Sequence, residues 1–225
     1  MKKGRFNFFK IVVHLAGWFP LVQIVYDAFN QHLTANPIQA IEQRTGIHAL
    51  TFLLFSLACT PLSAVTGWRA LTLRRKALGN YGFMYAALHV FTFFVIDYGL
   101  NLGAIWRDVG TKIYIILGFV AFLLLLPVAV TSFRYWMKRL GKNWKRLHRL
   151  VYIISPLVIF HFILVVKGSL LRLQGNLIQP LVYGGIAIVL LLLRIPTIKK
   201  GLINFRMRGM DWLRATRLQR LFSRS

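Results

Sequence analysis

The sequence predicts an all-α, polytopic membrane protein with six transmembrane helices and with both termini in the cytoplasm. Of its 225 residues, 57% are hydrophobic and only 15% are charged, a balance typical of membrane proteins rather than of soluble domains. A hydrocarbon core roughly 30 Å thick requires about 20 apolar helical residues. Six runs of this kind lie between polar or basic segments, at residues 8–29, 47–66, 78–98, 112–133, 148–166 and 177–195.

The first three runs differ in character. Residues 8–29 follow a basic start, and no small-residue cleavage site comes after them, so we expect a retained helix rather than a signal peptide. Residues 47–66 contain Pro61 near their end. Residues 78–98 form the weakest run because they carry His89 and Asp97. This polar load itself indicates a functional helix.

The last three runs are more apolar. The fourth run is the clearest of the six, because residues 113–130 contain no charged side chain. The fifth begins at His148 and contains Pro156, and the sixth precedes the basic end of the chain. Prolines inside membrane helices are tolerated as kinks, since neighbouring helices satisfy the freed backbone groups.

The distribution of charge predicts the topology. The net charge of +24 would by itself suggest a nucleic-acid binder. However, 24 of the 29 Lys and Arg residues lie in every second segment between the predicted spans, and these segments share one side of the membrane. The segments are residues 1–10, 67–79, 132–149 and 194–225. The positive-inside rule places these segments in the cytoplasm. We therefore expect the cations to contact membrane lipid and expect no nucleic-acid partner.

We expect two parts in the chain. Residues 1–198 form the six-helix transmembrane domain, and residues 199–225 form a basic amphipathic cytoplasmic tail. Within the tail, residues 201–222 mix Leu, Phe and Met with Arg, which is typical of an interfacial helix.

Histidines inside the predicted spans are the candidate functional residues, because ionisable groups are costly in hydrocarbon. If the third helix enters near Gly79, His89 lies about 15 Å deep, and His161 lies roughly 20 Å beyond His148. His89 and His161 are then at similar depth in the outer half of the membrane. They could bind one haem iron from opposite sides. The alternative, a pair of interhelical hydrogen bonds, stays open.

His148 lies close to the inner boundary and is expected to serve a second site there. No histidine lies at the matching depth on the third helix; that position falls in the basic cluster Arg74, Arg75 and Lys76. These side chains could pair with haem propionates or with a flavin phosphate, or they could be topology signals alone. Thirteen residues turn an ideal helix by about 1300° and leave His148 and His161 on different faces. Pro156 or an irregular first turn at His148 could relieve this.

The remaining polar candidates are weaker. His14, early in the first helix, could border a site or bond to a neighbouring helix. His32 and His48 lie in or beside the first outer loop, where solvation explains them. The single cysteine, Cys59, excludes an intrachain disulfide and a Cys-X-X-Cys-His attachment. Any haem is therefore expected to be held without covalent bonds.

Several short stretches occur in a characteristic order along the chain. They are residues 14–17 (HLAG), 60–62 (TPL), 74–79 (RRKALG), 87–89 (ALH), 140–144 (LGKNW), 147–148 (LH), 151–152 (VY) and His161. In these stretches the chain resembles the MsrQ (YedZ) family, the haem-binding membrane subunit of the periplasmic methionine sulfoxide reductase system, within the ferric-reductase-like transmembrane group. The resemblance covers nearly the whole chain.

The resemblance implies transmembrane electron transfer by one or two b-type haems, with His89, His148 and His161 as axial ligands. Electrons would enter on the inner side from the quinone pool or from a flavin reductase, with FMN as a further possible cofactor. They would pass to a periplasmic molybdopterin methionine sulfoxide reductase subunit, in a heterodimer at the bacterial inner membrane. Methionine sulfoxide would be reduced on that partner subunit, so whether this chain counts as an enzyme stays open.

The chain departs from four-histidine relatives of the wider group, which leaves the second ligand of an inner haem unassigned. It also lacks a G-x-G-x-x-G segment, so it is not expected to oxidise nicotinamide unaided. Three other functions remain open. They are a metalloreductase-like haem subunit with another acceptor, a haem-free small transporter with a histidine proton relay, and a haem-free scaffold.

Overall fold

The computed structural model describes residues 8–167, 177–204 and 206–208, and helices dominate this part of the chain. No strand occurs among these residues, which confirms the predicted all-α class. The helical elements in chain order are α1 (Phe8–Phe29), α2 (Pro37–Thr66), α3 (Ala70–Phe91), the π-helical η1 (Thr92–Asp97), α4 (Leu102–Thr111), α5 (Ile113–Val130), α6 (Arg134–Leu140), α7 (Lys142–Leu147), the 3₁₀ turn η2 (His148–Leu150), α8 (Val151–Lys167) and α9 (Ile178–Leu192).

Five helical segments of the described chain are long and apolar enough to cross a membrane. They are α1, α2, α3 continued through η1, α5, and the run Lys142–Val166 that ends in α8. The sixth predicted span differs, because α9 has only 15 residues and bends by 80° into the helix Pro196–Arg208. The chain is thus a multi-pass membrane protein with up to six spans.

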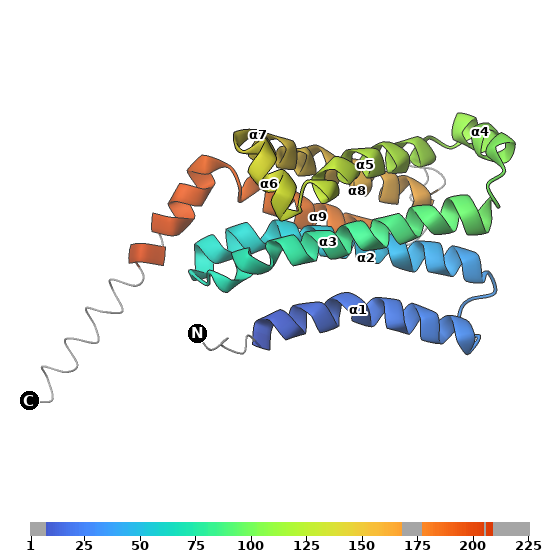
Figure 1. Cartoon of the computed structure of the whole chain (residues 1–225), viewed down its shortest axis with the longest axis horizontal. Coiled ribbons are helices and arrows are strands. Elements are labelled where there is room, and N and C mark those ends of the chain that lie inside the picture. The colour runs from blue at the N-terminus through green and yellow to red at the C-terminus, as the bar shows by residue number, and fades with distance from the viewer. Residues whose placement is uncertain (1–7, 168–176, 205, 209–225) are drawn as a thin grey trace, which may run out of the picture.

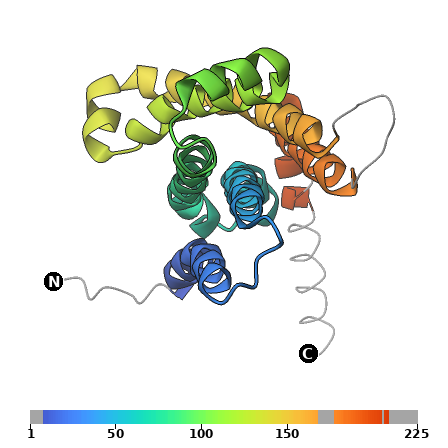
Figure 2. The ribbon, with the colours of Figure 1, turned by 90° about the vertical axis from the view of Figure 1, so that its right-hand side faces the viewer.

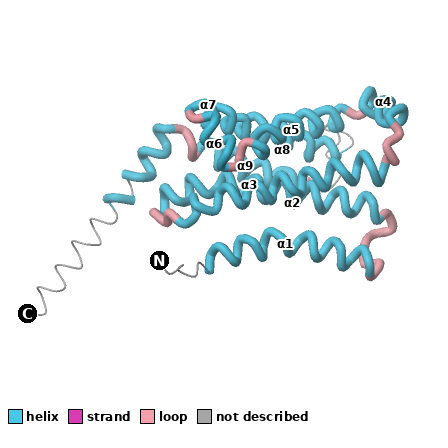
Figure 3. Tube along the Cα trace, viewed as in Figure 1, coloured by secondary structure: helices cyan, strands magenta, loops and turns pink. Residues whose placement is uncertain are grey.

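The long helices run alternately up and down the bundle (Figure 1). Figure 2, an end-on view, shows α1 on one side of the α2–α3 pair, with α5, α8 and α9 covering the other side. The loops lie at the two ends of the bundle (Figure 3). The basic helices α6 and α7 share one end with the α2–α3 connection, and α4 lies at the other end. That the basic end faces the cytoplasm stays a prediction of the charge pattern.

Helix α2 begins ten residues before the predicted span, because the residues that signal its start were not recognised in the sequence. Asn36 is its N-cap, because its side-chain oxygen accepts a hydrogen bond from the Gln39 N–H, and Pro37 occupies the first turn. Both residues are typical of helix starts. Glu42 and Gly46 are therefore helical rather than part of an outer loop. His48, expected beside that loop, lies within the bundle with its ring 5.5 Å from that of Tyr85.

Three short helices, α4, α6 and α7, were also not predicted, because their polar residues resembled loop sequence. Of the two features considered for the different faces of His148 and His161, an irregular turn occurs at His148, which begins the 3₁₀ turn η2, and Pro156 lies inside α8. The outer loop expected after residue 167 lies outside the described residues, as does most of the predicted interfacial helix. The division at residue 198 stays a prediction.

The core connects α2 to the helices on both sides. On one side, Leu50 and Leu57 of α2 pack with Ile154 of α8 and Leu190 of α9. On the other side, Tyr85 of α3 is fully buried. Its hydroxyl donates to the Gly17 carbonyl (2.8 Å) and accepts from the Leu21 N–H (3.0 Å).

Gly17 and Leu21 are the pair that a regular helix would bond directly, and they flank Pro20 inside α1. A side chain inserted into the helical ladder is a recognised cause of bending. The Tyr85 hydroxyl therefore fixes α1 to α3 at the point where α1 contains its proline.

We predict that Tyr85→Phe weakens the attachment of α1. The variant removes two buried hydrogen bonds, but Gly17 and Leu21 can still bond to each other, so the expected loss of unfolding free energy is about 0.5–1.5 kcal/mol. Denaturant unfolding in detergent measures it. Tyr26→Phe is the control, because Tyr26 is 59% exposed. An equal loss in both variants would contradict the proposed attachment.

Candidate functional site

Two of the predicted site histidines meet inside the bundle. His89 lies near the end of α3 and His161 lies in α8. Their ring centroids are 6.1 Å apart, and the ring planes are inclined by 79°. The prediction that these two side chains lie at similar depth is confirmed.

Each imidazole is oriented by a backbone carbonyl of a different helix. Nδ1 of His89 lies 2.9 Å from the Glu42 carbonyl oxygen in α2, and Nδ1 of His161 lies 2.7 Å from the Tyr114 carbonyl oxygen in α5. A carbonyl oxygen only accepts hydrogen bonds, so each Nδ1 carries the proton. Each Nε2 is then the nitrogen that can bind a metal.

A glycine one helical turn beyond each carbonyl admits the imidazole. A methyl group at Gly46 would lie 3.3 Å from Nδ1 of His89, and one at Gly118 would lie 2.8 Å from the ring of His161. Both histidines also lie 47 residues after their carbonyl partners. The α2–α3 and α5–α8 pairs thus repeat one device that the sequence pattern did not reveal.

The backbone after His89 is unusual. Helix α3 passes into the π-helical turn η1 three residues beyond it. The hydroxyl of Thr92, which is buried, donates to the Leu88 carbonyl at 2.9 Å. Single π-helical turns inside α-helices are frequent at functional sites, and this one widens the helix beside the histidine pair.

The histidine pair fits a metal ion held between two axial imidazoles. With metal–nitrogen bonds of about 2 Å, two such rings have centroids roughly 6 Å apart, close to the 6.1 Å observed. Imidazole is a suitable ligand for iron, and bis-imidazole ligation occupies both axial positions of a haem. Each Nδ1 is hydrogen-bonded to a carbonyl oxygen, and each Nε2 is left to bind a metal. This pair of donor atoms fits a haem.

His148 lies at the basic end, apart from the histidine pair. Its Nδ1 lies 3.1 Å from the Trp144 carbonyl oxygen, and the Trp144 ring lies 4.0 Å from its own ring. Of the predicted basic cluster, Arg75 lies within electrostatic range of His148 and also of Arg194. Arg194 in turn donates to the Leu57 carbonyl (2.6 Å) and to the Tyr152 hydroxyl (3.1 Å).

The predicted basic cluster does not act as one unit. Successive helical residues point about 100° apart, so Arg75 lies near His148 whereas Lys76 lines a groove with His14 on the other side of α3. The guanidinium Nε of Arg74 is buried and has no hydrogen-bond partner among the described residues. His14 contacts Tyr81, with 2.8 Å between Nδ1 and the hydroxyl oxygen. His14 is therefore remote from the histidine pair and borders a separate site.

Sequence reasoning missed the residues that position the histidines, namely Glu42, Gly46, Tyr114 and Gly118, and also the inner residues Tyr152 and Arg194. A glycine inside an apolar run at histidine depth was the available signal for Gly118. The carbonyl partners carried no signal, because any residue type supplies a carbonyl.

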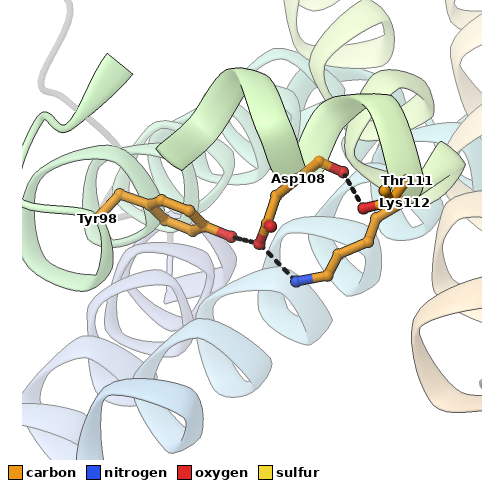
Figure 4. Close-up of polar contacts among 4 residues, drawn as sticks. All are labelled: Tyr98, Asp108, Thr111 and Lys112. Carbon is orange, nitrogen blue, oxygen red and sulfur yellow. Dashed lines mark hydrogen bonds and ion pairs between the residues drawn. The ribbon is translucent and has the colours of Figure 1, made fainter. Parts of the chain in front are cut away.

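A polar cluster lies between η1 and α5, at the end of the bundle opposite the basic helices α6 and α7 (Figure 4). The Asp108 carboxylate accepts hydrogen bonds from the Tyr98 hydroxyl and from the Lys112 ammonium group, the latter at 2.5 Å. These two bonds, led by that from Lys112, lower the pKa of Asp108. Burial and the bond to Asp108 raise the pKa of Tyr98 to about 12. The bond to Asp108 also raises the pKa of Lys112.

The chain is similar to known proteins over most of its length. Residues 45–159 match the family described as ferric reductase like transmembrane component. A protein-methionine-sulfoxide reductase heme-binding subunit MsrQ of Rhodospirillum rubrum is 38% identical over 200 residues, which are 88% of this chain and 93% of the relative. The MsrQ subunit of Xanthomonas oryzae is 38% identical over 188 residues (81% and 83%). That of Herminiimonas arsenicoxydans is 38% identical over 187 residues (83% and 84%).

We predict opposite effects from two glycine substitutions. Gly118→Ala places a methyl group against the His161 ring and should destabilise the protein by roughly 1–3 kcal/mol, as overpacking does. Gly185→Ala is the matched control, because its methyl group would meet no atom within 4 Å. That variant should be neutral or more stable by up to about 1 kcal/mol, since alanine favours helix. Thermal unfolding in detergent tests both, and equal stability of the two variants would refute the tight approach at Gly118.

We predict that the outer cluster loosens in acid. Because the pKa of Asp108 is lower in the folded protein, its contribution is present at neutral pH and is lost as the pH falls below about 4. The raised pKa values of Tyr98 and Lys112 keep both donors protonated up to about pH 10. Hydrogen exchange of α4, corrected for intrinsic rates, should be constant between about pH 5 and 7 and should rise at about pH 3. In the Asp108→Asn variant, α4 should exchange faster at neutral pH and show no rise in acid. A rise in acid in this variant would show that a group other than Asp108 causes the loosening.

Proposed function

The chain belongs to the MsrQ family within the ferric-reductase-like transmembrane group, and we propose that it carries electrons across the bacterial inner membrane by means of b-type haem. The relatives are named as the heme-binding subunit of a protein-methionine-sulfoxide reductase. Family membership and the multi-pass fold support a membrane electron-transfer role. The protein's own part in such a role is to hold, orient and insulate the redox group.

The juxtaposition of His89 and His161 is the observation that carries the proposal. These two side chains would hold one haem through their Nε2 atoms. When bound, the haem supplies reversible one-electron oxidation and reduction. The Glu42 and Tyr114 carbonyls fix the imidazole tautomers and increase the basicity of Nε2. Ligation on both faces suits electron transfer rather than the binding of a gas.

The surroundings of His148 support a second site nearer the inner surface. Arg75 and Arg194 are two cations within electrostatic range of each other, and an anion between them would relieve their repulsion. Either the propionates of a second haem with His148 as ligand or the phosphate of FMN has this charge. We therefore propose one haem at the histidine pair and a second haem or a flavin at the basic end.

The charge pattern and the family resemblance support a direction of transfer along the bundle. Electrons from quinol or from a flavin reductase would enter at the basic end and pass through the histidine pair within the bundle to the outer end. We propose a periplasmic molybdopterin methionine sulfoxide reductase as the partner in a heterodimer. Methionine sulfoxide in oxidised proteins would be reduced on that subunit, and this chain would be its electron-transfer subunit.

A metalloreductase-like subunit would contain the same haem but would use another acceptor. The discriminating experiment is reoxidation of the reduced chain on mixing with the sulfoxide reductase subunit and methionine sulfoxide. A haem-free transporter or scaffold would be colourless when purified.

We predict that the detergent-purified chain shows b-type haem bands after reduction with dithionite. His89→Ala and His161→Ala should each abolish the same haem, because each removes one of its two axial ligands. His148→Ala should leave that haem in place and should affect only the inner site. The visible spectrum and the haem content per chain measure these effects.

His32→Ala is the control, because the His32 ring contacts only the outer-end Tyr26 ring among the aromatic contacts of the described residues. It should retain all of the haem. Equal loss of haem in the three site variants would contradict the separation of the two sites. Absence of haem from the unaltered chain would refute the proposed function.

A further inference from the structure

A groove of about 410 Å³ lies between α1 and α3, away from both sites described above. Its polar lining consists of His14, Lys76, Asn80 and Tyr81, and Leu73 and Met84 contribute apolar surface. The volume lies within the range of small-molecule sites, which combine apolar walls with a few polar groups.

The polar groups of this groove are unusual for their position. His14, Asn80 and Lys76 are exposed, yet they lie on helices that are long and apolar enough to cross the membrane. Side chains that donate or accept hydrogen bonds are costly at a lipid-facing surface and usually mark a functional site. A bound molecule with a polar head would satisfy them.

The side chains of the groove are held in place by packing and by a hydrogen bond. The Tyr81 ring lies directly on the backbone of α1, since a methyl group at Gly17 would come within 2.4 Å of it. Trp18 meets the same ring edge-on at a centroid distance of 6.2 Å. The hydrogen bond between Tyr81 and Nδ1 of His14 then fixes the imidazole, so that Nε2 remains for a ligand. Two hydrogen-bonding groups are thus held in one arrangement before any ligand arrives.

The groove lies at the inner edge of the hydrocarbon layer, because it begins in the first turns of α3, beside the basic residues Arg69, Arg74 and Arg75. On the lipid side, the neighbouring Leu15, Trp18 and Phe19 of α1 are exposed. A ligand can therefore enter from the lipid and keep its head near the aqueous boundary. The occupant must be an amphiphile with an apolar tail.

A row of aromatic rings leads from the groove into the interior of the helix bundle. Tyr81 contacts Phe52 at 5.7 Å, Phe52 stacks on Tyr85 at 5.5 Å with an interplanar angle of 4°, and Tyr85 contacts His48 at 5.5 Å. His48 lies two residues from Gly46, which contacts His89. Packed rings thus lead from the groove to His48, and the α2 backbone between His48 and Gly46 leads on to His89. A phospholipid head would make no use of this connection, whereas a redox-active ring would.

We propose that this groove binds the head group of a quinol, with His14 and Tyr81 hydrogen-bonded to its oxygen atoms. This inference rests on the proposed function, because it needs a haem at His89 and His161 as the electron acceptor. One quinol loses two electrons and two protons, both O–H bonds break, and a quinone is formed. A haem held by His89 and His161 would accept the two electrons one at a time, with reoxidation between them, or would share them with a second haem. The protons pass in turn through His14 to water at the inner surface.

A binding experiment tests the groove independently of haem. The purified chain in detergent is photolabelled with a short-chain azidoquinone, and labelled peptides are identified by mass spectrometry. We expect label within residues 8–18 or 70–86 and competition by unlabelled quinone. His14→Leu and Tyr81→Phe should weaken labelling about tenfold, as loss of one ligand hydrogen bond does. Labelling that phosphatidylglycerol suppresses and quinone does not would overturn the proposal in favour of a lipid site.

A kinetic experiment tests the redox role. Oxidised protein is mixed anaerobically with a short-chain quinol, and haem reduction is followed by absorbance. His14→Leu and Tyr81→Phe should reduce the rate about tenfold while their dithionite-reduced spectra stay unchanged. Tyr183→Phe is the matched control, because it removes a hydroxyl bonded to Thr51 (2.8 Å) at the α2–α9 contact, and it should keep the full rate.

The two experiments separate the failures. Equal rates in all variants that retain haem would overturn the quinol groove and leave the haem proposal intact. Absence of haem would refute the proposed function, and photolabelling would then decide alone whether the groove binds a quinone.

Discussion

The satisfaction of polar groups inside a hydrocarbon layer is the constraint on which the rest of this structure depends. An imidazole in such a layer needs a hydrogen-bond partner from the protein. His89 and His161 meet this need with carbonyl oxygens of Glu42 and Tyr114. A close approach between helices is then required, and it occurs where Gly46 and Gly118 leave room for the rings. The packing of α3 on α2 and of α8 on α5 thus serves the same end twice.

The same constraint distributes the remaining polar groups between the two ends of the bundle. At the basic end, His148 with Arg75 and the groove at His14 and Tyr81 lie on opposite sides of the α2–α3 pair. At the opposite end, the Arg44–Asp27 ion pair joins α1 to α2, and the Tyr98–Asp108–Lys112 cluster holds α4 on α5. The histidine pair lies between these ends. Polar side chains therefore gather at the basic end, where electrons would enter, and within the bundle. Elsewhere the long helices face the lipid with apolar side chains.

Much of the fold was predictable because hydropathy and charge are local signals. The boundaries of α1 and α5 agree closely with the predicted spans, and the irregular turn at His148 was expected. The start of α2 and the helix α4 were missed because capping residues such as Asn36 and Asn101 precede polar helical turns that resemble loops. The short, bent sixth span at α9 was not predicted either, because its apolar run continues to Ile195 although the backbone bends there.

The sequence by itself determined that the chain crosses the membrane several times, which segments form the basic end, and which histidines share a depth. Run length, charge and the rise of 1.5 Å per helical residue contain that information. Only the tertiary structure decided which nitrogen of each imidazole is available, which glycines admit the rings, and that Lys76 lies with His14 whereas Arg75 lies with His148. These outcomes depend on the rotation of each helix about its axis and on close backbone contact between helices. Backbone carbonyls are present at every residue, so no residue pattern indicates which of them is used.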